Sequence, residues 1–242
     1  MALLSDDLVE RVLVVVAHPD DIDFGTAGSV AVWTEMGIDV SYCLVTSGDA
    51  GGHDESVSRT EIVEIRQAEQ TAAAKVVGVT DLHWLGFADG RVEATLDLRA
   101  AITRVIRDVR PQRVVAMSPE RNYDRIYASH PDHLATGEAT MAAVYPDSRN
   151  PFAFPELVEN GYAPWTVDEV LFSTHGEPDR FVDVTEVFDR KLQALKCHVS
   201  QHQNPDGLDK LLRDWNGFNA AVGGLPEGRL AESFRAIDTN PF

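Results

Sequence analysis

The chain has 242 residues, of which 44% are apolar, and its formal net charge is −18. This size and apolar fraction suit one α/β domain with a sizeable core and exclude an intrinsically disordered chain. The acidic charge would repel phosphate groups, so we expect no nucleic-acid partner and no charge-driven docking on anionic membranes.

Cysteine content and hydropathy bear on the cellular compartment of the protein and on its association with membranes. Cys43 and Cys197 are too few for a disulfide framework, and a reduced cytoplasm is the simplest interpretation. The start of the chain shows no signal-peptide pattern, and no apolar run reaches the roughly 18–20 residues that span a bilayer. We therefore predict a cytoplasmic protein without stable membrane insertion.

Segments of strand type alternate along the chain with segments of helical period. We predict strands over residues 12–17, 40–46, 81–86, 113–118 and 168–174, and helices over 26–36, 59–76, 96–109, 132–144, 185–199 and 206–222. This alternation predicts a Rossmann-like three-layer α/β fold, with a mostly parallel sheet and helices on both faces. We expect one domain over 1–242, with a core from about 12 to 201 and a C-terminal helical part over 202–242.

Residues 145–167 form an unusually long connection without a helical or strand period. The segment carries four prolines, and its aromatic residues, among them Phe152 and Trp165, argue against disorder. Loops of this length in compact domains are usually functional or disordered. We therefore expect it either to line a substrate cleft or to cover the core.

Polar clusters follow four of the predicted strands. They are HPDD at 18–21, TSGDAGG at 46–52, GFADG at 86–90 and the segment 118–133, which ends in SHPDH. Because ligands of parallel sheets lie beyond the carboxyl ends of the strands, these clusters predict one active site at a single edge.

The first and last of these clusters carry side chains that suit a catalytic metal. His18 and Asp21 lie three residues apart on a tight loop, and an imidazole with a carboxylate is a suitable pair of zinc ligands. Either His130 or His133 would complete a set of two histidines and one carboxylate with an open position, as in zinc sites that activate water. The same donors tolerate iron, cobalt or nickel. Asp20 could hold the water, although Asp20 and Asp132 could instead cap helices.

Six motifs occur in an order that resembles one family: AHPDD at 17–21, TSGDAGG at 46–52, RQAE at 66–69, LGFADG at 85–90, HPDH at 130–133 and HVSQ at 198–201. The chain looks like a member of the PIG-L/LmbE-like family of zinc-dependent N-deacetylases and amidases. The resemblance implies one Zn²⁺ per chain, with the metal ligands His18, Asp21 and His133. It also implies that Asp20 is the general base, that His130 stabilises the oxyanion and that Asp132 tunes His130.

The resemblance further implies substrate-binding roles for Arg66, Asp89 and Asp49. Each has a simpler alternative or a departure from the family pattern: Arg66 could pair with Glu69 on a solvated helix face, and ADG at 88–90 is also a good turn sequence. Asp49 lies where many members carry Glu, and its shorter side chain puts direct substrate contact in doubt.

Other polar residues are open at this level. His198 and Gln201 could brace the metal loop or only end a helix, and we take His53, His83 and His175 as structural or surface residues. Ala128 stands where some sugar-inositol deacetylases of the family have tyrosine, two residues before the first histidine of HPDH.

We therefore expect a metal-dependent hydrolase that removes an N-acetyl group from an N-acetylglucosamine-type sugar or conjugate, with this small molecule as its partner. The alternatives are an amidase on a thiol-sugar conjugate, a deacetylase that tailors a secondary metabolite, and a non-catalytic binding protein on the same fold. A nucleotide-binding module would need a glycine-rich loop after the first strand, where the chain has HPDD instead. Family members are often oligomeric, so a homo-oligomer is possible.

Overall fold

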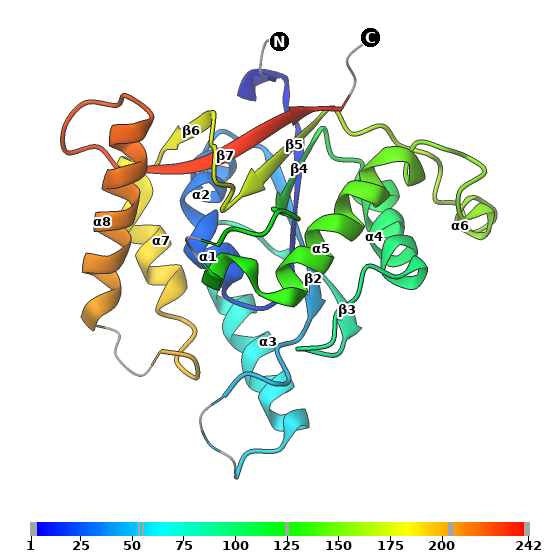
Figure 1. The fold of residues 1–242 in the computed structure, drawn as a ribbon, viewed down its shortest axis with the longest axis horizontal. Helices are drawn as coiled ribbons and strands as arrows, with labels where there is room; N and C mark the ends of the chain where they lie inside the picture. The colour runs from blue at the N-terminus through cyan, green and yellow to red at the C-terminus, as the bar shows by residue number, and fades with distance from the viewer. Residues whose placement is uncertain (1–3, 53, 55, 124–125, 203–205, 240–242) are drawn as a thin grey trace.

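A seven-stranded sheet forms the centre of the molecule in the computed structural model, which describes residues 4–52, 54, 56–123, 126–202 and 206–239 (Figure 1). The strand order is β3-β2-β1-β4-β5-β7-β6. The strands are β1 (Arg11–Val16), β2 (Asp39–Thr46), β3 (Asp81–Phe87), β4 (Arg113–Met117), β5 (Glu169–Ser173), β6 (Arg180–Asp183) and β7 (Ala231–Asp238). Strands β1 to β5 pair in parallel, whereas β7 runs antiparallel to both β5 and β6.

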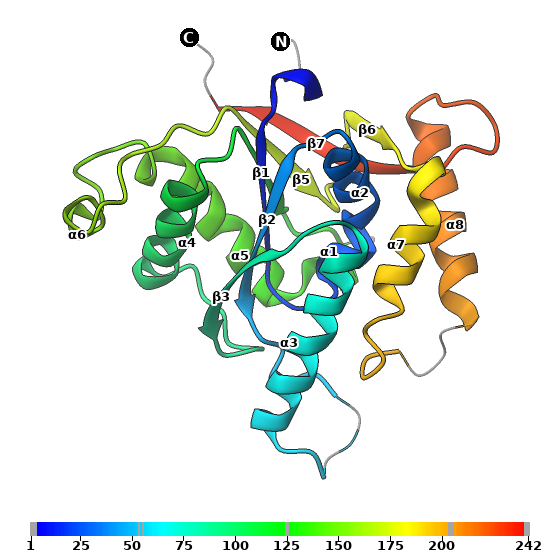
Figure 2. The same ribbon diagram turned by 180° about the vertical axis from the view of Figure 1, so that it is seen from behind.

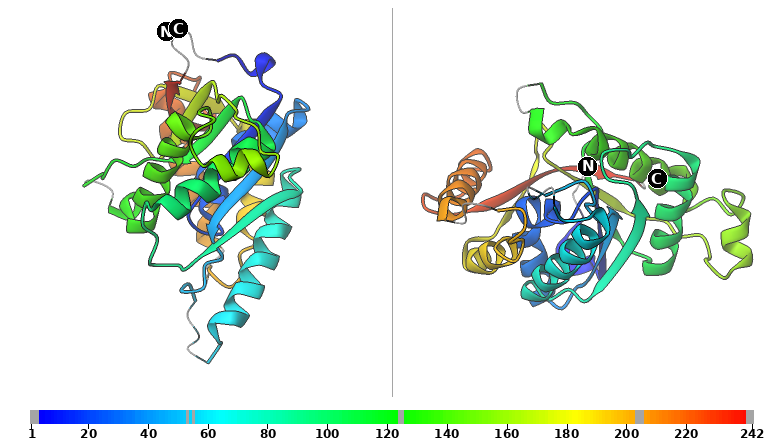
Figure 3. Two further views of the ribbon diagram at one scale, coloured as in Figure 1. Left: turned by 90° about the vertical axis from the view of Figure 1, so that its right-hand side faces the viewer. Right: turned by 90° about the horizontal axis from the view of Figure 1, so that it is seen from below.

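Helices cover both faces of this sheet, as the two opposite views and the view from below show (Figures 1, 2 and 3). The α-helices of the described residues are α1 (Asp21–Gly25), α2 (Ala27–Glu35), α3 (Arg59–Val76), α4 (Leu96–Val109), α5 (Pro131–Ala142), α6 (Pro155–Glu159), α7 (Phe188–Leu195) and α8 (Asp206–Val222). The predicted three-layer α/β fold with a mostly parallel sheet is confirmed.

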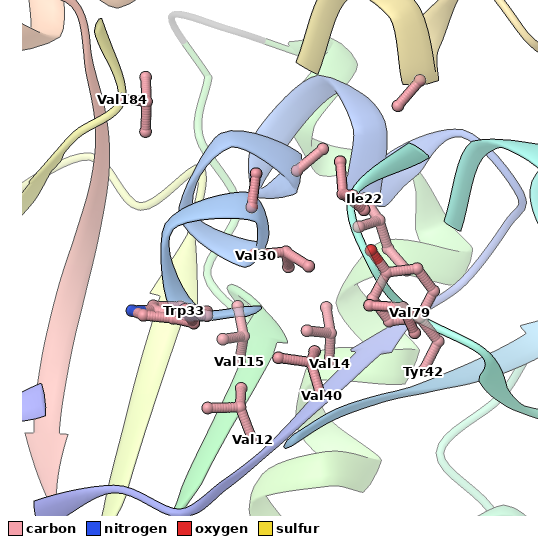
Figure 4. Close-up of a cluster of buried hydrophobic side chains, with 14 of the residues drawn as sticks. Val12, Val14, Ile22, Val30, Trp33, Val40, Tyr42, Val79, Val115 and Val184 are labelled. Carbon is pink, nitrogen blue, oxygen red and sulfur yellow. The ribbon is translucent and has the colours of Figure 1, made fainter. Parts of the chain in front are cut away.

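Strand β1 shows why the sheet needs two covering layers. Val12 and Val14 face a core built with α2, while Leu13 and Val15 face a second core built with α4 and α5. Figure 4 shows Val12, Val14 and Val115 on the side of the sheet that faces Val30 and Trp33 of α2 in the first core. Because successive side chains of a strand point to opposite faces, an unbroken apolar run such as this one is buried on both sides.

Local signals set several helix ends where we predict them. At the start of α3, Ser58 and Glu61 form a reciprocal capping box, and Gly78 follows the helix with a φ of 88°. The predicted helix over 26–36 is observed as α2, and the short helix α1, which we did not predict, precedes it. The two helices are separate because Thr26 leaves helical geometry with a φ of −141°. The predicted helices at 59–76, 96–109 and 206–222 have the observed bounds of α3, α4 and α8.

The predicted C-terminal helical part over 202–242 contains α8 but is not helical to its end, because β7 follows α8 and enters the main sheet. The strand sequence AESFRAID has alternating burial, but one of its buried positions is occupied by the charged residue Glu232. A carboxylate at a core position hides the alternation of apolar and polar residues that identifies a strand. The four-residue strand β6 was missed because it is too short to show a period.

The segment 145–167 packs at the amino edge of the sheet, so the cleft-lining interpretation is wrong for this chain and the core-covering one describes it. The Trp165 indole nitrogen donates to the carbonyl of Pro111, just before β4, at 2.7 Å. The buried guanidinium of Arg107 donates to the carbonyls of Asp147, Asn150 and Ala153 at 2.8–3.0 Å. The segment includes the short helix α6, which lies at the flank of the molecule (Figure 1).

A buried ion pair joins the antiparallel end of the sheet to the helices beside it. Lys191 of α7 donates to the Glu232 carboxylate at 2.5 Å and to the carbonyls of Asp23 and Phe24 at 3.2 and 2.6 Å. The same carboxylate accepts the backbone N–H groups at the start of α2, from Gly28 and Ser29, where the helix dipole favours an anion. The pair therefore fixes α1, α2 and α7 against β7.

None of the helices in the described ranges is both long and apolar enough to cross a membrane.

We predict that Lys191→Met lowers the free energy of unfolding by about 3–5 kcal/mol, because Glu232 would keep a buried charge without its cation. Lys196→Met, at the exposed end of the same helix, should change it by less than about 0.5 kcal/mol. Urea unfolding followed by circular dichroism measures both values. Equal effects of the two substitutions would contradict a structural role for the pair.

Candidate active site

The loops after β1 to β4 gather at the carboxyl edge of the sheet and bring the predicted site residues together. The loop after β1 supplies His18 and Asp20, and α1 begins at Asp21. The loop after β3 supplies Asp89, and α5, which follows β4, begins just after His130. In Figure 1 the start of α5 and α1 lie close together at this edge.

Three of these side chains form a compact triangle of donor atoms. His133 Nε2 lies 3.1 Å from Asp21 Oδ1 and 3.3 Å from His18 Nδ1, and His18 Nδ1 lies 3.3 Å from Asp21 Oδ2. Ligands at about 2.0–2.1 Å from a tetrahedral zinc ion are roughly 3.3 Å apart. The donors His18, Asp21 and His133 therefore fit three corners of such a site.

The other ring nitrogen of His18 faces two carboxylates. His18 Nε2 lies 3.1 Å from Asp89 Oδ1 and 3.2 Å from Asp132 Oδ2. A carboxylate on the far nitrogen of a metal-bound histidine fixes its tautomer and makes it a better ligand. His18 also groups with Asp89 and Asp132, or with His130 and His133, within metal-binding reach. Both oxygens of Asp132, however, already accept backbone N–H groups, which favours a bracing role.

The charges around His18 suit a divalent cation. Burial opposes a charge on His18, but the carboxylates of Asp132, Asp21 and Asp89 raise its pKa to about 12. Burial also opposes ionisation of Asp21, yet His133 and His18 hold the pKa of that carboxyl far below its usual value. The site thus concentrates negative charge around two imidazoles, which a bound dication would balance.

Asp132 does not contact His130 through its carboxylate, but the charge of that carboxylate raises the pKa of His130, so the interpretation that Asp132 tunes His130 stays a prediction. Its side chain is 1% exposed, and it accepts the N–H groups of Gly90 at 2.7 Å and Val92 at 3.3 Å besides contacting His18. These bonds tie the loop after β3 to the start of α5. Only the backbone N–H of Asp132 reaches His130, donating to Nδ1 at 3.2 Å.

His130 is the exposed histidine of the cluster and caps α5. Because its Nδ1 accepts the backbone N–H of Asp132, the proton of the neutral ring lies on Nε2. Its ring centre is 5.1 Å from that of His18 and 5.3 Å from that of His133. Burial and the nearby His18 and His133 lower the pKa of His130.

Asp20 adopts a left-handed backbone conformation, with a φ of 84°. Such a conformation is uncommon for a residue other than glycine and persists only where the surroundings stabilise it. Here the Asp20 N–H donates to Gln70 Oε1 at 2.9 Å, and Arg66 Nη2 lies 3.4 Å from the carboxylate. Burial and the neighbouring Asp21 raise the pKa of Asp20 to about 7, whereas Arg66 lowers it.

Gln70 and Asp23 support this turn and are the residues that sequence reasoning missed. Gln70 Nε2 donates to Asp23 Oδ2 at 3.0 Å, and His198 Nε2 lies 2.8 Å from the same oxygen. His198 therefore braces the start of α1 through Asp23. Of the two roles we considered for His198, this contact favours the bracing role over that of only ending a helix. Gln70 lies four residues after Arg66 on α3, so helical spacing alone could have identified it as facing the same site.

Arg66 supports the loops around the site and does not pair with Glu69. Its guanidinium is buried and donates to the carbonyls of Pro19 at 2.7 Å and Gly48 at 3.2 Å. At Gly48, with a φ of 70°, an added Cβ would lie 2.2 Å from this guanidinium, so a larger residue would displace it. Glu69 instead accepts hydrogen bonds from Ser200.

Asp49 and Asp89 brace each other. Asp49 Oδ1 accepts the N–H of Asp89 at 2.9 Å, and its Oδ2 pairs with Arg59 at 2.7 Å. Asp89 Oδ2 accepts the N–H of Ala50 at 3.1 Å. Asp89 also contacts His18 through Oδ1. The carboxylates of Asp49 and Asp89 therefore both bind groups of the protein itself.

The remaining polar residues lie outside the metal cluster. His83 pairs with Asp81 at the start of β3, and His175 pairs with Glu120 and stacks on Phe172. Gln201 donates to Ser200. His53 lies outside the described residues.

Comparisons with known proteins agree with this arrangement. The family model PIG-L, GlcNAc-PI de-N-acetylase, matches residues 13–144. The diacetylchitobiose deacetylase of Thermococcus kodakarensis is 35% identical over 95% of this chain and 84% of its own length. A probable N-acetyl-alpha-D-glucosaminyl L-malate deacetylase 2 of Bacillus cereus is 35% identical over 79% of this chain and 83% of its own. The inhibitor-bound N,N'-diacetylchitobiose deacetylase from Pyrococcus horikoshii has a TM-score of 0.88 at 28% identity, over 98% of this chain and 88% of that one.

We predict that His133→Ala loses tight binding of a divalent metal, whereas His130→Ala retains about one equivalent, because only His133 lies in the donor triangle. His83→Ala, at the amino end of β3, is the matched control. Elemental analysis after metal loading and dialysis measures the stoichiometry. Metal loss in His130→Ala with retention in His133→Ala would reverse the two assignments.

Proposed function

Because the chain belongs to the PIG-L family of GlcNAc-PI de-N-acetylases, we propose that it is a zinc-dependent hydrolase that removes the N-acetyl group from an N-acetylglucosamine-type sugar or conjugate. The observation that carries this proposal is the donor triangle of His18, Asp21 and His133, with Asp20 and His130 beside it. Relatives named as deacetylases of N-acetylated sugars support the same reaction.

His18, Asp21 and His133 would hold the zinc ion, which supplies Lewis-acid polarisation of the amide carbonyl and lowers the pKa of water. The chemical demands on the rest of the site follow from amide hydrolysis. A base must take a proton from the attacking water, a donor must stabilise the tetrahedral oxyanion, and the leaving amine must receive a proton.

Asp20 is the base in this proposal. A carboxyl group with a pKa of about 7 can accept a proton from water at neutral pH and return it to the leaving nitrogen. Gln70 fixes the backbone of Asp20, and Arg66 lies beside its carboxylate. Asp20 is therefore held in place by groups that do not themselves react.

His130 is the donor to the oxyanion. Its Nδ1 is occupied by the backbone N–H at the start of α5, so its Nε2–H is the group left to donate. The Nε2–H of His130 is present whether the ring is neutral or charged. Because this donor is already in place, it can stabilise the negative charge that develops on the oxyanion without a rearrangement of the site.

Cys43 and Cys197 are free thiols, with Cys43 buried in β2. They support placing the enzyme in a reducing compartment, and we place it in the cytoplasm.

The direct test is acetate and amine release from N-acetylglucosamine and N,N'-diacetylchitobiose, with zinc content measured on the same protein. We expect about one zinc per chain and release that stops on chelation and returns on adding zinc. A zinc-loaded protein inactive on both sugars and on N-acetylglucosaminyl conjugates would refute the substrate class.

We predict that Asp20→Asn keeps the metal and lowers kcat about 10²–10⁴-fold, because the amide cannot accept the proton from water. Asp39→Asn, exposed at the amino end of β2, should leave kcat unchanged. Steady-state kinetics with zinc analysis of each variant gives both values. Loss of zinc from Asp20→Asn would make Asp20 a ligand instead of the base.

We predict that Gln70→Leu lowers kcat about tenfold and retains zinc, because the Asp20 turn loses its hydrogen bond. The exposed Glu64→Ala on the same helix is the control. A change in KM alone, with kcat at the wild-type value, would show that Gln70 does not position the base.

A further inference from the structure

His130, the proposed donor to the oxyanion, is held by fewer contacts than the metal ligands around it. Its side chain is exposed, and within the described part of the chain it accepts one hydrogen bond, from the backbone N–H of Asp132 to Nδ1. His18, by contrast, is contacted at both ring nitrogens, and His133 contacts both Asp21 and His18. The direction of the His130 Nε2–H bond therefore depends on the backbone that leads into His130.

Helix α5 itself is fixed by contacts that do not involve this backbone. Gly137 lies against the end of β4, where an added Cβ would be 2.4 Å from the carbonyl oxygen of Met117 and 2.9 Å from the nitrogen of Pro119. The Asp132 carboxylate accepts two backbone N–H groups from the loop after β3. His133, in the first turn of α5, therefore keeps its position as long as the helix packs on β4.

Ser129 closes the loop that enters α5. Its Oγ accepts the N–H of Asn122 at 2.7 Å and donates to the carbonyl of Asn122 at 3.2 Å. The guanidinium of Arg121 donates to the Ser129 carbonyl at 3.3 Å, and Ser129 is 2% exposed. One buried hydroxyl thus joins the two ends of the segment 122–129, directly before His130.

Apolar packing adds little to the stability of this loop. Its large apolar side chains are exposed, namely Tyr123, Ile126 and Tyr127. Side chains that stay in water contribute little hydrophobic free energy. Glu120 pairs with His175 at the start of the loop, away from His130, and a pair with an exposed carboxylate is weak. Among the described contacts, the hydrogen bonds of Ser129 are therefore those that hold the end of the loop at His130.

We propose that Ser129 is a positioning residue of the reaction, which orients the Nε2–H of His130 toward the oxyanion and is not needed for zinc binding. The inference rests on the proposed function, because it takes His130 as the donor to the oxyanion. Ser129 acts through His130 and is not itself a catalytic residue. Its contribution arises because a donor stabilises the oxyanion only when it is already aimed at it.

The kinetic test uses Ser129→Ala with N-acetylglucosamine and N,N'-diacetylchitobiose. We expect kcat to fall about tenfold, because a displaced donor loses part of the about 10²–10³-fold that one oxyanion donor contributes. KM and a content of about one zinc per chain should stay at the wild-type values. Ser148→Ala is the matched control, since it removes a buried hydroxyl that donates to the Val144 carbonyl at the amino edge, and it should leave kcat unchanged. Loss of zinc from Ser129→Ala would show that Ser129 supports the metal ligands, contrary to the proposal.

A double-mutant cycle separates positioning of His130 from a general structural effect. In the His130→Ala background, Ser129→Ala should lower kcat no further, because the group that Ser129 positions is absent. A second tenfold fall in that background would show that Ser129 acts independently of His130 and would refute the proposal.

Nuclear magnetic resonance of the histidine rings tests the same contact without turnover. In zinc-loaded protein with isotope-labelled histidine, the signals of His130 are identified by their loss in His130→Ala. They should shift in Ser129→Ala and stay in place in Ser148→Ala. Unshifted His130 signals in Ser129→Ala would refute the positioning role even if the wild type deacetylates both sugars. If the wild type hydrolyses neither sugar and the signals do shift, the proposed function fails while the hold of Ser129 on His130 stands.

Discussion

The active site depends on His18 being held at both ring nitrogens. Asp89 and Asp132 contact Nε2, while Asp21 and His133 lie around Nδ1. A ring engaged on both sides cannot rotate, so Nδ1 is presented to a metal in one fixed direction. The loops after β1, β3 and β4 all contribute to these contacts, and a shift in any one of them would move His18.

Gathering carboxylates at one edge of the sheet costs electrostatic repulsion, and the structure offsets it locally. Asp132 accepts two backbone N–H groups, and the Asp89 carboxylate accepts one, so each is stabilised before any metal binds. Burial and the neighbouring charge of Asp21 raise the pKa of Asp20 to about 7. Burial opposes ionisation of Asp132 as well, but its hydrogen bonds to His18 and to two backbone N–H groups lower its pKa. The same cluster thus contains Asp132, which stays ionised and orients His18, and Asp20, which can exchange a proton near neutral pH.

How much the sequence can reveal depends on whether the signal is local. The run VLVVVA, the capping box of Ser58 with Glu61 and the HPDD motif are contiguous, and they predict β1, the start of α3 and the metal loop. The contact of Asp132 with His18 spans 114 residues, and nothing near Asp132 indicates that its carboxylate points there rather than at His130. Strand β7 was missed for the same reason, because Glu232 is tolerated in the core only through Lys191, 41 residues away.

This distant ion pair also links the antiparallel end of the sheet to the chemistry. Lys191 binds the carbonyls of Asp23 and Phe24 at the end of α1, and Asp21 at the start of the same short helix is in the donor triangle. The position of α1, and with it the position of Asp21, is therefore set partly by α7 and β7.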